Sequence, residues 1–307
     1  MRVVFFGTPE FAVPSLEALL GEGFDVLTVV TQPDRPQGRS RSSIVPSPVK
    51  IAALEEEIPL LQPERPREPA FVAELKALAP EIGVVVAYGH ILTPELLAVP
   101  RRGMVNVHPS LLPELRGAAP VEWAILNGAE RTGVTIMQMD AGMDSGPILH
   151  QLPHHMAPDV TGGELSTHLA EMGAQALVEA LALLEQDSLK PVPQDHARAT
   201  YAPKLTRETA RISWTEPAER VARVIRALDP RPGAWTELEE RSVKLFGARP
   251  VAGRGTPGEV LATAPRLVVA AGEGAVEVDE VQVEGKSRMS AAEWDRGHGG
   301  VLGRRFT

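Results

Sequence analysis

The chain has 307 residues, of which 43% are hydrophobic and 23% charged, a composition typical of one or two globular domains rather than of a disordered or fibrous protein. It contains no cysteine, which excludes disulfides, thiolate nucleophiles and cysteine-ligated metal sites. No apolar run approaches the roughly 18 to 20 residues of a membrane span, and the short apolar start is broken at Glu10, so we expect a cytoplasmic protein with no membrane-embedded part.

The net charge is −9, which speaks against a protein that coats nucleic acid indiscriminately, because that mode of binding needs a basic surface. The charge is unevenly distributed. Residues 1–203 carry 14 basic and 25 acidic side chains, whereas residues 204–307 carry 17 basic and 15 acidic ones. Within the acidic part, residues 31–50 have four basic side chains and one acidic side chain. Two regions could therefore meet an anionic partner.

The first part of the chain alternates predicted strands with predicted helices. An apolar run is followed by Gly-Thr-Pro-Glu, which is typical of a strand that leads into a helix. The predicted strands are residues 2–6, 26–31, 58–61, 82–87, 104–107 and 134–139. The predicted helices are residues 11–20, 48–57, 71–79, 120–126 and 161–184. Because several strands are apolar at every position, they should be buried on both faces, which predicts a Rossmann-like, mainly parallel α/β sheet.

The rest of the chain is richer in short strands. Residues 190–203 contain three prolines and are predicted to be a linker. A helix is predicted for residues 221–228. Strands are predicted for residues 235–238, 243–246, 258–262, 266–270 and 275–283. Five short strands in roughly 100 residues fit a small OB-like β-barrel. We therefore expect a domain at residues 1–189, a linker at 190–206 and a second domain at 207–307.

Two common nucleotide sites are disfavoured. The turn after the first strand, residues 7–10, lacks the second glycine that lets the backbone approach a pyrophosphate, so NAD is not expected. The Gly-Lys-Ser at residues 285–287 has no glycine five positions earlier, so it does not form a P-loop.

Three polar side chains form the candidate site. Asn106 and His108 lie two apart on a predicted strand, so they share one face near its carboxyl end, where ligands bind in open α/β sheets. Asp144 lies between two glycines in the loop after the next predicted strand. From spacing alone, the first two could equally be a hydrogen-bonded structural pair, and Asp144 could belong to an ordinary Asx turn.

Longer motifs surround these residues. Asn106 to Pro113 reads Asn-Val-His-Pro-Ser-Leu-Leu-Pro, and it is followed by Gly-Ala-Ala-Pro at 117–120 and by the loop 140–147. This pattern resembles the folate-dependent formyltransferases. Further motifs narrow the resemblance to the members that act on methionyl-tRNA. These motifs lie at residues 6–12, 32–36, 46–50, 85–89, 210–214, 225–229 and 233–235.

The resemblance implies transfer of a formyl group from 10-formyltetrahydrofolate to the amino group of methionyl initiator tRNA, for translation initiation. In that reaction Asn106 would donate a hydrogen bond to the developing oxyanion, His108 would accept the amine proton, and Asp144 would orient the imidazole. No metal and no obligate protein partner are expected. The first domain would be the catalytic formyltransferase domain, and the second would bind tRNA.

The resemblance also implies binding residues. The folate candidates are Val86, Ala87, Tyr88, Gly89, Ile91, Ser110, Leu111, Leu112, Pro113, Gln138 and Asp140. The tRNA candidates are Arg35, Arg39, Arg41 and Lys50. One departure concerns Glu114, which stands where the family usually has a basic residue, so no tRNA contact is assigned there.

Other readings keep part of this pattern. The same three residues could serve a folate-dependent formyltransferase with a small amine acceptor, or a hydrolase that releases formate. A catalytically silent RNA-binding protein is a third possibility. The neighbouring His154 and His155 should alternate across a strand, which makes joint chelation of one metal ion unfavourable.

Overall fold

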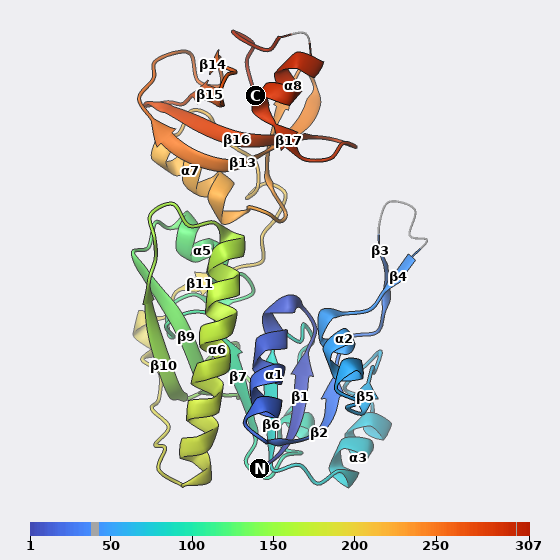
Figure 1. Cartoon of the computed structure of the whole chain (residues 1–307). Coiled ribbons are helices and arrows are strands. Elements are labelled where there is room, and N and C mark those ends of the chain that lie inside the picture. The colour runs from blue at the N-terminus through green and yellow to red at the C-terminus, as the bar shows by residue number, and fades with distance from the viewer. Residues whose placement is uncertain (38–42, 299) are drawn as a thin grey trace. The chain divides into compact units, whose positions relative to one another are not determined.

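The computed structural model describes residues 1–37, 43–298 and 300–307. The chain forms two compact units, and Figure 1 shows the elements of each. Unit 1 consists of residues 1–117, 132–154 and 166–201, and unit 2 consists of residues 118–131, 155–165 and 202–307. The units are therefore interleaved along the chain, and much of the predicted linker lies in unit 1.

Unit 1 is built on a seven-stranded sheet with the order β10-β9-β7-β6-β1-β2-β5. The strands are β1 (Arg2–Gly7), β2 (Asp25–Val30), β5 (Leu60–Leu61), β6 (Ile82–Val86), β7 (Met104–His108), β9 (Arg131–Gln138) and β10 (Ile148–His155). Strands β2, β1, β6 and β7 pair in parallel, whereas β9 runs antiparallel to β7. The predicted mainly parallel sheet is confirmed. Of strand β10 only His154 and His155 were expected to lie on a strand, because most of its residues are half-buried and show no apolar pattern.

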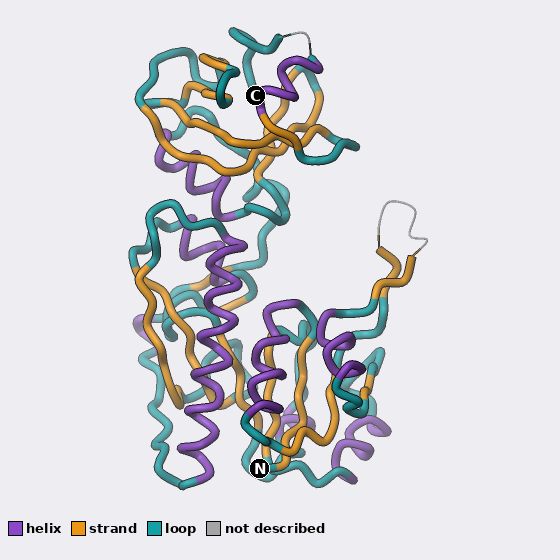
Figure 2. Tube along the Cα trace, viewed as in Figure 1, coloured by secondary structure: helices purple, strands orange, loops and turns teal. Residues whose placement is uncertain are grey.

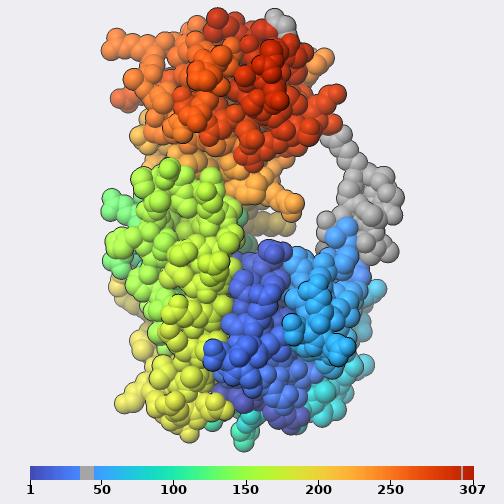
Figure 3. Space-filling model, in the orientation of Figure 1, coloured from blue at the N-terminus to red at the C-terminus, as the bar shows by residue number. Residues whose placement is uncertain are grey.

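Helices cover this sheet (Figure 2). They are α1 (Val13–Gly21), α2 (Pro48–Glu55), α3 (Pro69–Ala77), α4 (Pro94–Leu97) and α6 (Gly162–Glu185), with the 3-10 turns η1 (Glu10–Ala12) and η2 (His196–Arg198). In the space-filling view, α1 and α6 form much of the visible surface of unit 1 (Figure 3). Helix α6 packs on β10, where His150 donates a hydrogen bond to Glu179 (2.7 Å). No helix of the described residues is long and apolar enough to cross a membrane.

The core of unit 1 follows from the apolar strands. Every residue of β6 is buried, and so is every residue of β1 after Arg2. Phe6 meets the ring of Tyr88 edge-on at 5.3 Å between centroids. At the start of α2, the Ser47 hydroxyl caps the helix by accepting the Lys50 backbone N–H. These contacts fix the carboxyl ends of β1 and β6, where the candidate residues lie.

The basic segment of unit 1 contains two strands that were not predicted. Strand β3 (Arg35–Gln37) pairs antiparallel with β4 (Ser43–Val45), with Arg35 opposite Val45. Each strand has only three residues, which is too short to show the alternating pattern on which prediction depends.

Unit 2 is built on an antiparallel sheet that curls into a half-barrel, with the order β12-β13-β16-β15-β14 and with β17 paired to β16. The strands are β12 (Ala234–Leu238), β13 (Arg241–Val251), β14 (Val260–Ala262), β15 (Leu267–Ala270), β16 (Ala275–Val283) and β17 (Met289–Ser290). The helices of unit 2 are α5 (Pro120–Leu126), α7 (Ala218–Ala227) and α8 (Ala291–Gly297). Two short strands, β8 (Arg116–Gly117) and β11 (Tyr201–Ala202), lie where the chain passes from one unit to the other. The five predicted strands are present, and β17 and α8 were missed.

Aromatic rings form the centre of unit 2. Phe306 stacks on Trp214 at 5.7 Å and on Trp294 at 6.0 Å, measured between ring centroids. The Trp214 indole N–H donates to the Thr236 hydroxyl (2.9 Å), which satisfies its polar atom inside the core. Arg220 of α7 donates to the Leu126 carbonyl of α5 (2.9 Å), so these two helices pack within the unit.

Candidate active site

The site is built on the carboxyl end of β7. Asn106 and His108 share one face of this strand, with Asn106 half-buried and His108 only 4% exposed. Asn106 lies opposite Val85 of β6 on one side and Met137 of β9 on the other. Its side-chain amide makes no hydrogen bond to any residue that the structure describes, so its N–H groups can be donated to a ligand.

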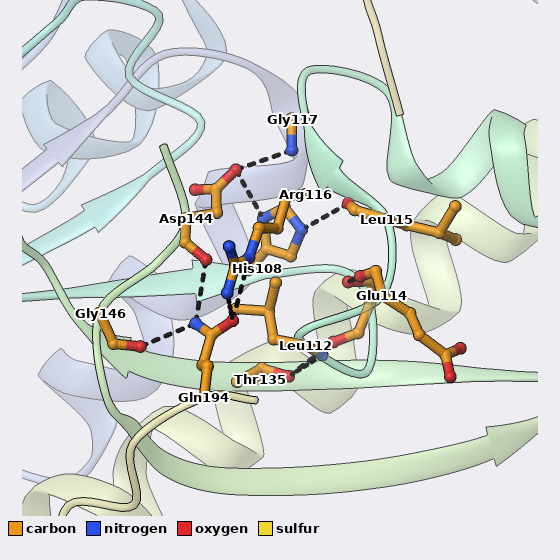
Figure 4. Close-up of polar contacts among 11 residues, drawn as sticks. His108, Leu112, Glu114, Leu115, Arg116, Gly117, Thr135, Asp144, Gly146 and Gln194 are labelled. Carbon is orange, nitrogen blue, oxygen red and sulfur yellow. Dashed lines mark hydrogen bonds and ion pairs between the residues drawn. The ribbon is translucent and has the colours of Figure 1, made fainter. Parts of the chain in front are cut away.

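One hydrogen bond defines the protonation of His108. Its Nε2 lies 3.0 Å from the Leu115 carbonyl oxygen, which can only accept, so Nε2 carries the hydrogen. In the neutral ring the other nitrogen, Nδ1, then has a free lone pair. Nδ1 faces the Asp144 carboxylate at 3.8 Å (Figure 4). This distance allows a charge interaction and exceeds that of a hydrogen bond, so the imidazole is oriented by Leu115 rather than by the predicted partner Asp144.

The electrostatic surroundings keep His108 neutral. Burial lowers the pKa of His108, whereas the negative charge of Asp144 and the Leu115 carbonyl raise it, and the balance lies below the ordinary value of 6.5. Near neutral pH the ring is therefore a free base. When Nδ1 accepts a proton, the nearby carboxylate stabilises the resulting cation.

Asp144 is held in a tightly folded loop. Its backbone has a φ of 48°, and its carboxylate accepts the Gly117 backbone N–H at 2.8 Å. At the start of the loop, Asp140 accepts hydrogen bonds from the Gly142 N–H and the Ser145 hydroxyl, both at 2.9 Å. The loop after β9 thus brings its acid to His108, as the motif led us to expect.

The predicted folate residues after β6 lie beside an open cavity. Val86 is buried, whereas Ala87 is exposed and Ile91 is 93% exposed. The backbone turns sharply here, with φ of 47° at Ala87 and 82° at Gly89. Tyr88 points into the core instead, where burial raises the pKa of its hydroxyl to about 12. Its carbonyl already accepts two side-chain hydrogen bonds, from Thr8 (3.1 Å) and Gln32 (2.9 Å).

The cavity has a volume of about 590 Å³, within the range of small-molecule sites. It is lined by Glu64, Arg65, Pro66, Arg67, Gly89, His90, Ile91 and Thr93. Arg65 and Arg67 are exposed, and neither makes a side-chain hydrogen bond or ion pair with the part of the chain that the structure describes. The cavity therefore offers two free cations next to the loop after β6.

The predicted folate residues after β7 are fixed by internal hydrogen bonds. The buried Ser110 hydroxyl donates to the Glu114 carbonyl (2.6 Å), and the Leu112 N–H donates to the Thr135 hydroxyl (3.1 Å). Leu111 and Pro113 are half-buried. On the neighbouring strand, Gln138 is half-buried and Asp140 is exposed. Residues 110–113 follow the His108 end of β7, but the polar groups of Ser110 and Leu112 are already used in internal hydrogen bonds. Gln138 pairs with Val105, nearer the start of β7.

The predicted tRNA residues are only partly described. Arg39 and Arg41 lie outside the described residues, and for Arg35 only the backbone position in β3 is described. The Lys50 ammonium donates to Asp34 (2.5 Å) and Gln62 (2.9 Å), and this contact lowers the pKa of Asp34. Lys50 would therefore have to leave Asp34 to reach a phosphate.

Two site residues were missed by sequence reasoning. Arg116 and Gln194 are buried and hydrogen-bonded to one another beside Asp144 (Figure 4). Arg116 stands inside the recognised motif and could have been singled out. Gln194 lies in a proline-containing segment read as a linker, and its sequence surroundings carry no signal of burial.

Comparisons with known proteins point to one family. The formyl transferase model matches residues 1–181, and the model of the formyl transferase C-terminal domain matches residues 204–299. A methionyl-tRNA formyltransferase from Roseiflexus sp. (strain RS-1) is 50% identical over 97% of this chain and 92% of its own length. One from Magnetococcus marinus is 46% identical over 99% of this chain and 98% of its own length.

Solved structures share the fold at low identity. HypX from Aquifex aeolicus in complex with tetrahydrofolic acid has a TM-score of 0.67 and 22% identity, and the match covers 96% of this chain but 46% of HypX. The N-formyltransferase from Helicobacter canadensis, solved with folinic acid and dTDP-3-aminofucose, has a TM-score of 0.70 and 17% identity over 91% of this chain and 98% of its own. The recognised motifs and the matched models lead to one conclusion: this chain belongs to the formyl transferase family.

Proposed function

We propose that this chain transfers a formyl group from 10-formyltetrahydrofolate to the α-amino group of methionyl initiator tRNA, a reaction of the cytoplasm that precedes translation initiation. The observation that carries the proposal is a buried, neutral His108 whose free Nδ1 faces a carboxylate, two residues from the unpaired amide of Asn106. The names of the relatives that match nearly the whole chain support the same substrates.

The proposed chemistry assigns one task to each side chain. As the amine nitrogen bonds to the formyl carbon, negative charge grows on the formyl oxygen, and the Asn106 N–H can stabilise it, an effect worth roughly 10²- to 10³-fold in rate. His108 accepts the amine proton at Nδ1, worth roughly 10²- to 10⁴-fold. Asp144 stabilises the imidazolium, which then returns the proton to the departing nitrogen of the donor. Protons therefore balance within the site.

The acceptor needs little activation. An α-amino group has an ordinary pKa of about 7.7 to 8.0, so part of it is already uncharged near pH 7. A neutral His108 is then sufficient to remove the proton that the nitrogen gains on bond formation.

The formyl donor fits the side of the site formed by residues 64–67 and 86–93, which we call the open side. It is a flat ring system that carries carboxylates at its far end. The exposed backbone turn at Ala87 and Gly89 begins beside β7, because β6 and β7 pair in parallel. Arg65 and Arg67 of the adjoining cavity could then receive the carboxylates. Gln138 and Asp140 stay candidates for folate binding, on β9 and in the loop that follows it.

A small acceptor in place of tRNA is not favoured. The two relatives described above that are named for methionyl-tRNA are 50% and 46% identical over nearly the full chain, whereas the neighbour solved with dTDP-3-aminofucose shares 17% identity and therefore only the fold.

The test is an assay with labelled 10-formyltetrahydrofolate. The proposal expects labelled formylmethionyl-tRNA when methionyl initiator tRNA is added, and no labelled product with free methionine or amino sugars. Transfer to a small amine without tRNA, or release of formate alone, would contradict it.

A further inference from the structure

The segment after α6 returns to the candidate active site. Residues 190–200 are all described, and among them only Gln194 is buried, with 6% of its surface exposed. A buried polar side chain in an otherwise exposed segment needs hydrogen-bond partners to offset its desolvation. Its partners show what the segment does.

The Gln194 amide joins two parts of the site (Figure 4). Its Nε2 donates to the backbone carbonyls of Asp144 (2.9 Å) and Gly146 (2.7 Å). Its Oε1 accepts from Nε (3.1 Å) and Nη2 (2.5 Å) of Arg116. A glutamine amide has two donors and two acceptor lone pairs, so all four are used.

Arg116 occupies a central place between the two catalytic contacts. The residue before it, Leu115, accepts the His108 N–H, and the residue after it, Gly117, donates to the Asp144 carboxylate. The guanidinium is buried, and no described carboxylate lies within ion-pair distance of it. Besides Gln194 it has only the ring of His196, whose Nδ1 accepts at 3.1 Å.

We propose that Gln194 is a positioning residue for the transfer, which fixes the backbone that carries Asp144 against the backbone at Arg116 that holds His108. This inference rests on the proposed function. Asp144 has a left-handed φ of 48°, which aspartate adopts more readily than most residues, and hydrogen bonds hold the loop around it in place. The two carbonyl contacts from Gln194 supply that hold on the loop between β9 and β10.

Two substitutions separate positioning from mere folding. Gln194→Met has a similar volume and loses all four hydrogen bonds. Gln194→Glu retains an acceptor for Arg116, with added charge attraction, but loses both donations to the loop carbonyls. The matched control is Gln186→Glu, the same chemical change at an exposed position near the end of the preceding helix region.

In the formyl-transfer assay, we expect kcat of both Gln194 variants to fall about 10- to 100-fold, since a displacement of about 1 Å at a reacting group has an effect of this size. The KM for methionyl-tRNA should change by less than about twofold, because Gln194 makes no contact with substrate. Gln194→Glu should melt near the wild-type temperature. The Gln186→Glu control should keep its kcat.

A second readout does not depend on activity. The Gly117 amide is protected by its bond to Asp144, so its hydrogen exchange in the ligand-free protein should accelerate in both Gln194 variants and not in the control. Unchanged kcat or unchanged Gly117 exchange in both variants would overturn the positioning role, as would a loss of kcat that merely follows loss of folded protein. A wild-type protein that formylates no tRNA would refute the proposed function alone, since the exchange measurement still reports on Gln194.

Discussion

The two sides of the candidate site differ in how their polar groups are used. The anchored side consists of residues 108–117, 144–146 and 194, and its backbone and side chains are tied to one another by short hydrogen bonds. The open side consists of residues 64–67 and 86–93, with an exposed turn, a cavity and two unpaired arginines. We therefore propose that the anchored side holds the catalytic groups in place, whereas the open side is left free to bind a ligand.

The largest expected effect is on the anchored side, at His108. His108→Ala removes the proton acceptor, so kcat should fall roughly 10²- to 10⁴-fold in the formylation assay while donor affinity is retained. The exposed His155→Ala is the matched control and should keep full activity. A His108→Ala enzyme with near wild-type kcat would remove the distinction between the two sides.

Asn106→Ala should follow in size. It removes the donor expected to face the formyl oxygen, and a loss of roughly 10²- to 10³-fold in kcat is expected from the same assay. Because the Asn106 amide bonds to no described residue, the melting temperature should change little. A large loss of stability with unchanged kcat would instead assign Asn106 a structural role.

The pH profile sharpens the comparison further. In the proposed mechanism the active form of His108 is neutral, so kcat/KM, expressed per uncharged acceptor amine, should rise with pH through a pKa below 6.5 and then level off. Asp144 raises the pKa of His108, so Asp144→Asn should move this limb to lower pH as well as lower the plateau. A limb that stays in place or moves to higher pH would contradict the assigned charge interaction.

The smallest effect is expected on the open side. The double variant Arg65→Ala/Arg67→Ala should raise the KM for the folate donor by a few-fold, because each exposed contact contributes only about 0 to 1 kcal/mol. The increase should shrink as salt is added, and kcat should be unchanged. An equal loss in kcat would place these arginines among the catalytic groups.

The sequence predicted those parts of the fold in which the pattern of apolar residues matches the burial of the side chains. The all-apolar strands at β1 and β6 were predicted, and so were Asn106 and His108, because strand alternation places them on one face. Most of strand β10 was missed, since most of its residues are half-buried. Helix α8 was also missed, although Ser290 and Glu293 form a capping box that the sequence displays.

The anchored side could be predicted only in part. The motif gave the candidate catalytic residues, but the resemblance does not say which atoms hold their side chains in place. The Leu115 carbonyl orients His108 through a backbone atom, which no residue type reveals. The contact of Gln194 joins residues about 50 positions apart in sequence, a separation over which local patterns carry no information.

The most direct test of the account is the protonation of the His108 ring, measured by ¹⁵N NMR of the ligand-free protein near pH 7. A neutral imidazole with its hydrogen on Nε2 and a lone pair on Nδ1 is the predicted result. A ring that is charged at this pH, or one that carries its hydrogen on Nδ1, would contradict the role of His108 as the base.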